Sequence, residues 1–167
     1  MSPRAAARLA TLAFTRVYDY VAGKADWGSF NLRVEGRAGS ETRAGAHVRP
    51  DVPTCVLDEP LRDVCERVEA AGWDTCFVVD EADIVIGRLG RGALRGNREV
   101  MIAEAMTPGP STVRPSARLD AMVERMREQN LSNLPVTTSD GRLVGLLVRE
   151  DAERAMSSLE RSSGQPG

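Results

Sequence analysis

The sequence predicts an α/β fold in which a strand–helix–strand–strand–helix unit occurs twice. The first observation is an internal repeat, because a shift of 58 positions brings the two halves of the chain into register. The second is that the matched apolar positions follow the i, i+3, i+4, i+7 spacing of an amphipathic helix. These positions are Leu61, Val64, Cys65 and Val68 in the first copy and Leu119, Met122, Val123 and Met126 in the second.

The N-terminal part of the chain precedes the repeat. In residues 1–36, Ser2 is a good N-cap and Pro3 suits the first helical position, so a helix is expected near the start. The run RVYDYV that follows predicts a short strand. Residues 37–50 are mostly small or polar, which predicts a flexible linker.

The first copy is assigned to residues 51–98. Its helix is expected to end at Gly72, since glycine tolerates positive φ, and a strand is expected from Cys76. The next turn, EAD at residues 81–83, contains no glycine, so a looser hairpin is expected there than in the second copy.

The second copy, with a linker helix in front of it, is assigned to residues 99–160. The linker helix is expected to end before Pro108, and the SDG run at residues 139–141 predicts a tight turn between two strands. Asp151 then lies where the last helix begins. Residues 161–167 contain no apolar side chain, so we expect a disordered tail.

Composition limits the classes of function. The formal net charge of −2 gives no overall basic field, so no nucleic-acid partner is expected, and no apolar run is long enough for a membrane span. The N-terminus is interrupted by arginine and lacks the pattern of a secretory signal, which favours a cytoplasmic protein. Three cysteines and one histidine, without metal-ligand spacing, indicate neither a disulfide framework nor a metal site.

The repeat also accounts for the cysteines. Cys65 and Cys76 take the places of Val123 and Leu134, so they are expected in the core as small apolar residues. Cys55, beside an expected strand start, is the more accessible of the three in this interpretation.

The second copy resembles a CBS motif, the unit named after cystathionine beta-synthase. The resemblance lies in the MT opening, the TV strand followed by proline, the LPV strand, the DG turn and the ending GLLVRED. The first copy resembles a degenerate CBS motif, so the two together resemble a CBS pair. This resemblance implies a pseudo-twofold sandwich with two clefts. It implies adenosine-containing ligands such as AMP, ATP, S-adenosylmethionine or NAD, and frequent homodimers. No catalysis and no required cofactor are expected.

The resemblance also implies a set of nucleotide-binding residues. Asp151 would accept both ribose hydroxyls, and strand-edge residues would flank the adenine. The complete candidate set is Thr112, Val113, Leu134, Pro135, Val136, Gly145, Val148, Arg149 and Asp151. A second interpretation of Asp151 remains open, in which this acidic first-turn residue only stabilises the helix dipole, an effect of about 0.3–1 kcal/mol.

Some positions depart from the family pattern. The family has Ser or Thr where this chain has Val148, so a phosphate-binding hydroxyl is missing, although Arg149 supplies a charge. In the first copy the equivalent positions hold Gly90 and Ala93, which provide neither hydroxyl nor carboxylate. We therefore expect at most one equipped cleft and weak phosphate recognition, with a nucleoside-like ligand or none.

A group of arginines follows the second strand of the first copy. It offers either contacts to a polyanionic ligand or simply a solvated loop, and the sequence leaves both open. The group consists of Arg88, Arg91, Arg95 and Arg98.

Residues 1–36 resemble the C-terminal part of a rhodanese domain, through the strand followed by GKADW. A rhodanese works through a cysteine persulfide, and all three cysteines of this chain lie beyond residue 54, so sulfurtransferase activity is not expected. The fragment would pack on the CBS pair, pair between protomers or stay mobile. A mis-assigned start codon is a further hypothesis, in which the true start of the protein lies upstream.

Three functions follow from these observations. The preferred one is a non-catalytic regulatory module that senses an adenosine-containing ligand through the second motif. The alternative is a dimerising interaction scaffold that has lost nucleotide binding, and the third is a fragment related to sulfurtransferases.

Overall fold

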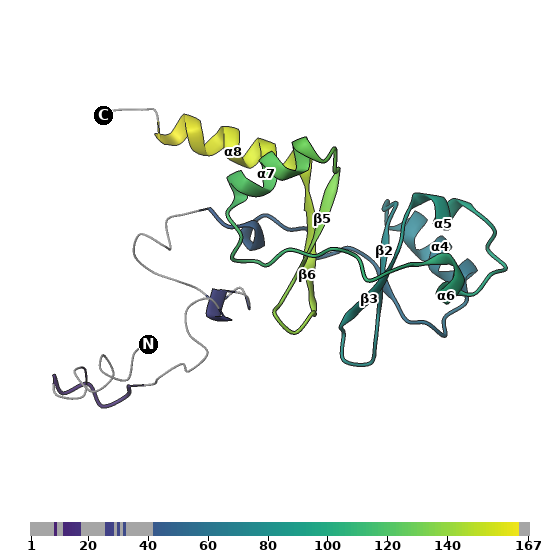
Figure 1. Cartoon of the computed structure of the whole chain (residues 1–167), viewed down its shortest axis with the longest axis horizontal. Coiled ribbons are helices and arrows are strands. Elements are labelled where there is room, and N and C mark those ends of the chain that lie inside the picture. Colours follow the sequence, from purple (N-terminus) through teal and green to yellow (C-terminus); the bar gives the residue numbers. More distant parts are fainter. Residues whose placement is uncertain are drawn as a thin grey trace.

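The computed structural model describes residues 9, 12–17, 26–28, 30, 32 and 42–163 and has a mixed α/β architecture (Figure 1). Most of the predicted rhodanese-like segment lies outside the described residues, so it stays a prediction. From residue 42 onward the elements are η1 (Ala44–Ala46), β1 (Thr54–Cys55), α4 (Leu61–Ala70), β2 (Cys76–Val79), β3 (Val85–Leu89), α5 (Arg91–Arg95), α6 (Ile102–Ala105), β4 (Thr107–Pro108), α7 (Leu119–Glu128), β5 (Asn133–Thr137), β6 (Leu143–Val148) and α8 (Arg149–Ser163).

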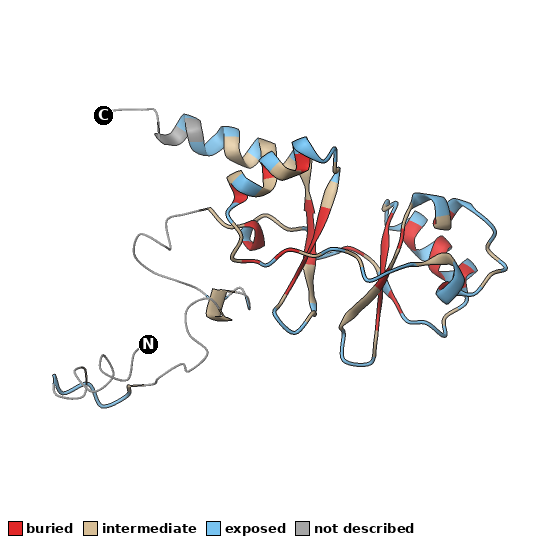
Figure 2. Ribbon diagram, viewed as in Figure 1, coloured by how far each residue is buried: buried red, intermediate tan, exposed pale blue. Residues whose placement is uncertain are grey.

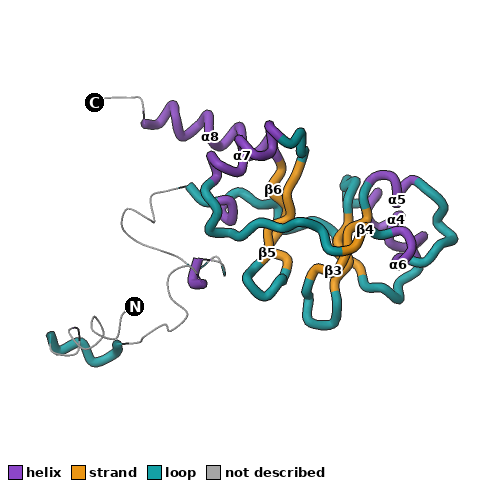
Figure 3. The backbone as a smooth tube through the Cα atoms, viewed as in Figure 1, coloured by secondary structure: helices purple, strands orange, loops and turns teal. Residues whose placement is uncertain are grey.

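Two β-hairpins lie side by side, and the helices of each half lie away from the other half (Figures 1 and 3). In the first half, the sheet order is β1-β2-β3-β4, with β1 parallel to β2 and the other neighbours antiparallel. In the second half, β5 and β6 form an antiparallel pair. Helices α4, α5 and α6 cover the first sheet, while α7 and α8 cover the second (Figure 1).

The predicted repeat is confirmed by the element bounds. Helices α4 and α7 both contain 10 residues and differ by 58 positions at each end. The hairpin β2–β3 corresponds in the same way to β5–β6. The apolar stripes predicted for the two helices are buried, including Leu61 and Val64 in α4 and Leu119 and Val123 in α7.

Each half has its own apolar core, and a third cluster joins them. The first core contains all three cysteines together with Leu89 and Ile102, and the second contains residues of α7, β5 and β6. Between the halves, Phe77 packs with Val52 and Leu146, all three at most 5% exposed. Figure 2 shows this burial along both hairpins and on the inner faces of the helices.

The segment immediately upstream of each half packs against the other half. We name residues 42–50 the first leader and residues 100–108, which match them at the same offset of 58, the second leader. In the second leader, β4 pairs with β3, with Thr107 opposite Arg88. In the first leader, Arg49 pairs with Leu146 of β6, and both N–H···O distances are 2.9 Å. The exchange is reciprocal, as an approximate twofold axis between the halves requires.

The order of residues 42–50 corrects the prediction of a flexible linker for that part of residues 37–50, and residues 37–41 lie outside the described part of the chain. Ala44 is fully buried in the core of the second half, and its N–H donates to the carbonyl of Ala117 over 2.8 Å. The next N–H, of Gly45, donates to the carbonyl of Pro115 over 3.0 Å. Two of the small residues that suggested flexibility, Ala44 and Gly45, are buried in this packing.

Two equivalent glycines lie where the leaders cross the hairpins. A Cβ on Gly145, whose φ is 156°, would lie 2.6 Å from the carbonyl oxygen of Arg49 and 3.0 Å from Cβ of Val48. A Cβ on Gly87 would lie 2.3 Å from Sδ of Met106, which matches Val48 in the repeat. Each glycine therefore allows close approach of the leader that belongs to the other half.

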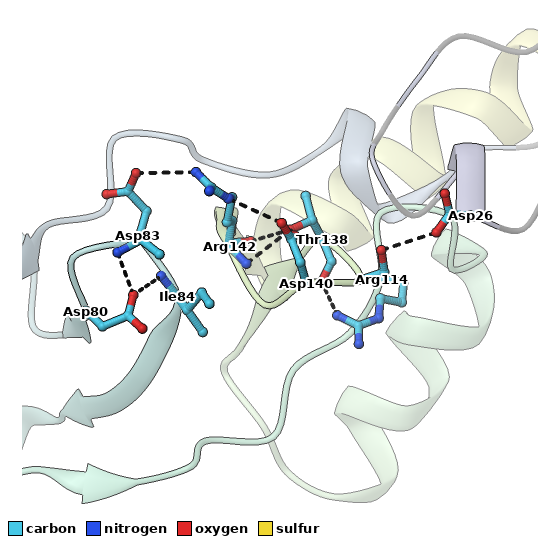
Figure 4. Close-up of polar contacts among 10 residues, drawn as sticks. Asp26, Asp80, Asp83, Ile84, Arg114, Thr138, Asp140 and Arg142 are labelled. Atoms are coloured by element: carbon cyan, nitrogen blue, oxygen red, sulfur yellow. Dashed lines mark hydrogen bonds and ion pairs between the residues drawn. The ribbon is translucent and has the colours of Figure 1, made fainter. Parts of the chain in front are cut away.

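The tips of the two hairpins also meet (Figure 4). The Val85 N–H donates to the carbonyl of Gly141 over 3.1 Å, and Arg142 forms an ion pair with Asp83 at 3.7 Å. In the first tip, Asp80 Oδ1 accepts hydrogen bonds from the N–H groups of Ala82 and Ile84, both at 2.9 Å. The carboxylate thus holds the turn that lacks glycine.

Helix α8 extends further than predicted. The tail was expected to begin at residue 161, but α8 ends at Ser163, and the remaining residues lie outside the described part. Polar side chains are compatible with an extra turn, since an exposed helix end needs no apolar stripe. Within the described part of the chain, no helix is both long enough and apolar enough to cross a membrane.

Candidate functional site

A cleft of about 480 Å³ lies between the two halves, at the hairpin ends opposite the tips. Its volume is in the range of small-molecule sites. We name it the central cleft, and its lining comes from three parts of the chain. The first leader contributes Arg49, the first half contributes Gly72, Trp73, Asp74, Arg91 and Arg95, and the second half contributes Ser132, Asn133, Leu146, Val148, Arg149 and Glu150.

The repeat explains why these residues meet. Arg91 and Arg149 are equivalent, each is the first residue of the helix after a hairpin, and both line the central cleft. Asp74 and Ser132 are equivalent residues in the loops that precede β2 and β5. Equivalent residues of the two halves therefore line the same cleft.

Asp151 lies in the first turn of α8, as predicted. Its Oδ2 accepts a hydrogen bond from Nε of Arg49 over 2.6 Å, and its Oδ1 accepts one from Nη1 of Arg154 over 3.2 Å. The side chain is 21% exposed, so it does not project freely into solvent. The hydrogen bond from Arg49 is the main cause of a lowered pKa for Asp151, and the carboxylate is therefore ionised at neutral pH.

Arg49 links three parts of the molecule. Its backbone belongs to the first leader, its guanidinium binds Asp151 of the second half, and the same group lies over the ring of Trp73 in the first half, 5.8 Å from the centroid. Hydrogen bonding to Asp151 raises the pKa of Arg49. The sequence interpretation did not include Arg49 in the site. At the repeat offset of 58, Arg49 matches Thr107, and this match is the signal that assigns Arg49 to the repeat.

Two of the nine candidate residues, Val148 and Arg149, line the central cleft. Asp151 is connected to it through Arg49 and follows Glu150 of the lining. Thr112 lies elsewhere, because its hydroxyl accepts a hydrogen bond from Thr137 over 2.9 Å, at the tip end of β5. Thr137 is four residues along β5 from Asn133, a separation of roughly 13 Å.

The expected adenine-flanking residues have structural partners. The Val113 N–H donates to Pro135 O and the Thr137 N–H donates to Val113 O, both over 2.9 Å, so these two N–H groups cannot also donate to an adenine edge. The side chains of Val113, Leu134 and Val136 are buried in the second core. Gly145 pairs with Val136 and is covered by the first leader, while Pro135 pairs with Leu146 and is buried. These residues form the wall behind the site.

The equivalent site in the first half has no carboxylate. Gly90 precedes α5, and Ala93 stands where the second half has Asp151. Across the described part of the chain, no group of three or more His, Cys, Asp or Glu side chains is placed to hold a metal ion.

The C-terminal part of the chain matches a family model. The model is that of the CBS domain, and the match covers residues 102–158. This segment is similar to a CBS domain. It begins in the second leader and ends in α8, so it includes β5, β6 and Asp151.

Two curated CBS-domain proteins of Arabidopsis thaliana are similar to this chain. CBS domain-containing protein CBSX2, chloroplastic, is 33% identical over 63 residues, which are 38% of this chain and 26% of that protein. CBS domain-containing protein CBSX1, chloroplastic, is 34% identical over 62 residues, 37% of this chain and 26% of that protein. The chain thus spans about a quarter of the length of these relatives.

Solved structures show that the likeness extends to both halves. CBSX2 in complex with AMP has a TM-score of 0.62 at 20% identity, with 71% of this chain and 98% of that chain covered. The cytosolic domain of the Mg²⁺ channel MgtE in complex with ATP gives 0.62 at 22% identity, covering 71% and 51%. The CBS domain pair of protein MJ0100, in complex with 5′-methylthioadenosine and S-adenosyl-L-methionine, gives 0.61 at 19%, covering 71% and 98%. The predicted CBS-pair fold is confirmed.

Proposed function

We propose that this chain is a non-catalytic regulatory module that senses an adenosine-containing ligand between its two CBS motifs. The observation that supports it best is the central cleft, which is large enough for a small ligand and has the ionised Asp151 beside it. A carboxylate can accept both hydroxyls of a ribose. AMP, ATP and S-adenosylmethionine, each present in a CBS-pair structure, are the candidate ligands together with NAD.

The Arg49–Asp151 ion pair gives this proposal a mechanism for regulation. A ribose that takes the hydrogen-bonding capacity of Asp151 competes with Arg49, which is part of the first leader. Ligand binding then weakens one attachment of the leader to the second half. The signal would pass to the part of the chain that precedes residue 42. We also propose that the module is cytoplasmic.

Isothermal titration calorimetry on the full chain tests the proposal with AMP, ADP, ATP, S-adenosylmethionine and NAD. We expect binding of at least one ligand, and its loss in Asp151→Ala. The matched control is Asp120→Ala, because Asp120 is also a first-turn aspartate that pairs with a neighbouring arginine, in α7. No binding below millimolar concentration, or equal losses in both variants, would reject the proposal.

A dimerising scaffold without nucleotide binding is the second candidate. Specific observations favour it: Asp151 already has a partner, Val148 has no hydroxyl, and Ala93 replaces the carboxylate of the first half. This function predicts a homodimer whose mass and thermal unfolding do not respond to any of the five ligands. Analytical ultracentrifugation and thermal unfolding with each ligand separate it from the sensing function.

A further inference from the structure

A groove of about 300 Å³ lies on the first half, between the start of α4 and the segment that leads into α6. We name it the α4 groove. Its lining consists of Glu59, Pro60, Leu61, Arg62, Asp63, Arg98, Glu99, Val100 and Met101. The central cleft is lined by other residues, so the α4 groove is a separate site.

The repeat explains why this groove is open. Helix α8 has 15 residues and runs alongside α7, whereas its counterpart α5 has 5 residues and ends at Arg95 (Figure 1). Residues 98–101 match residues 156–159, which are helical in α8, and Met156 packs against the second core. The first half thus lacks the last turns of this helix, and the α4 groove lies along the segment that replaces them.

The surface of the α4 groove is apolar in part. Met101 in its wall is 59% exposed. The loop before α4 exposes Val56 and Leu57, by 37% and 39%, and the Val56 N–H donates to Oε1 of Glu59 in the lining over 2.9 Å. Exposed apolar side chains from two segments therefore lie around one groove, and their burial by a partner is favourable.

The charges of the α4 groove leave one carboxylate over. Arg62 pairs with Glu99, and Glu59 pairs with Arg67 at 2.8 Å. Asp63 is exposed in the first turn of α4 and has no hydrogen-bond or ion-pair partner among the residues that the structure describes. An occupant that is both apolar and basic fits this groove best.

The chain contains one such segment near its start. Residues 4–16, RAAARLATLAFTR, contain three arginines and no acidic residue. Within this segment Leu12 and Phe14 are 59% and 58% exposed. The described part of the segment lies on the side of the second half, far from α4 and α6 (Figure 1). In a single copy, the apolar side chains of the segment and those of the groove therefore both stay exposed.

We propose that the α4 groove binds residues 4–16 of a second copy of this chain. Leu12 and Phe14 would be buried against Met101, and Asp63 would attract the arginines of the segment. An amphipathic segment in a groove is a common mode of peptide recognition. Two copies that exchange their segments reciprocally form a closed homodimer. The inference goes beyond the proposed function, because it assigns a protein-binding surface that takes no part in ligand sensing.

A fluorescein-labelled peptide of residues 4–16 tests the groove directly by fluorescence anisotropy. The titrant is the full chain with Leu12→Ser/Phe14→Ser, whose own segment can no longer compete. We expect the peptide to bind, and its affinity to fall as salt is raised. Adding Asp63→Asn/Met101→Gln should weaken binding about tenfold, since an apolar contact and a charge are both lost. The matched control adds Glu124→Gln/Leu159→Gln, at exposed positions of α7 and α8, and should bind as before.

Analytical ultracentrifugation of the full chain without any nucleotide tests the exchange between copies. The wild type should be a dimer, and the control Glu124→Gln/Leu159→Gln should stay one. Both Leu12→Ser/Phe14→Ser and Asp63→Asn/Met101→Gln should be monomers at the concentration at which the wild type is dimeric. All the substituted side chains are exposed, and far-UV circular dichroism checks that each variant is folded.

Three results would overturn the inference. The peptide does not bind, the control loses as much affinity as the groove variant, or the wild type stays monomeric. A dimer that persists in both the segment variant and the groove variant would also reject it, because the copies would then meet through another surface. Failure of ligand sensing gives a different result, since adenosine and nucleotides would not bind while the peptide and the dimer behave as expected.

Discussion

Arg49 and Asp151 are 102 residues apart in the sequence, yet Nε of one lies 2.6 Å from Oδ2 of the other. The contact joins the first leader to the helix start that would hold a ribose. Both interpretations of Asp151 from the sequence, a ligand site and a helix stabiliser, omitted this partner. Several properties of the protein depend on it.

The ion pair should oppose binding of a ribose. Arg49→Ala frees Oδ2 of the carboxylate, while Oδ1 keeps its contact with Arg154, so we expect adenosine, which has no phosphate, to bind more tightly than to the wild type. An increase of up to about fivefold corresponds to the worth of a partly exposed ion pair. Calorimetric titration with adenosine measures it. Weaker binding in Arg49→Ala would show that Arg49 contacts the ligand instead of competing with it.

The same pair should make stability depend on pH. The folded pKa of Asp151 is lowered, so its contribution is present above the ordinary aspartate value of about 3.9 and is lost as pH falls through the folded value. Arg49 is 49% exposed, which limits the contribution to about 1 kcal/mol or less. In urea unfolding, Asp151→Asn should differ from wild type above pH 5 and converge with it near pH 2. Asp58→Asn, at an exposed position, controls for the change in charge.

Gly145 should not tolerate a side chain. Gly145→Ala places a Cβ against the backbone of Arg49, which cannot move without breaking the leader pairing, so we expect a loss of about 2–4 kcal/mol. Gly87→Ala should cost less, about 1 kcal/mol, because the flexible Met106 side chain can move away. Both losses are measured by urea unfolding.

A matched control for these two variants lies in α5. A Cβ on Gly92 meets no atom within 4 Å, so Gly92→Ala should leave stability unchanged or raise it by about 0.5–1 kcal/mol. If Gly145→Ala were as stable as Gly92→Ala, the first leader would not pack against β6 as described.

The three thiols should be unreactive in the folded protein. Cys55, Cys65 and Cys76 are each at most 2% exposed, which closes off their access to the reagent. Burial raises the pKa of Cys65, while the hydrogen bond between Cys55 and Cys76 raises the pKa of Cys76 and lowers that of Cys55. Ellman's reagent should label almost no thiol within minutes under native conditions, and three per chain in guanidinium chloride. Rapid native labelling of Cys55, the one that the sequence suggested was accessible, would contradict this arrangement.

The sequence was most informative where structure is local. The helices α4 and α7 are indicated by their apolar spacing, and their equivalence is indicated by the repeat, so the fold of each half could be predicted. The two-residue strand β4 has no periodicity to detect, although the short strand at Cys55 was expected. The first leader was missed because its small residues resemble a linker: Ala44 and Ile102 are both fully buried at equivalent positions, but only isoleucine is apolar enough to indicate burial.

The candidate site could be predicted only in part. The placement of Asp151 at a helix start follows from the motif, and Val148 and Arg149 line the cleft. The arginines of the opposite half and Trp73 come into the site only when the two halves pack. The sequence motif of one half does not indicate which residues of the other half will lie beside it. Thr112 was assigned to the site as a strand-edge residue implied by the family resemblance, but Thr137 holds it at the other end of β5.

The exchanged leaders also determine the order in which the molecule can be completed during synthesis. The second leader emerges soon after the hairpin it binds, so the first half can close early. The first leader, made before either half, must wait for partners as far as 102 residues downstream, roughly 5–20 s at ribosomal speeds of about 5–20 residues per second. Until β6 leaves the ribosome, the first leader lacks the strand with which it pairs, and its ion pair with Asp151 in α8 can form only afterwards.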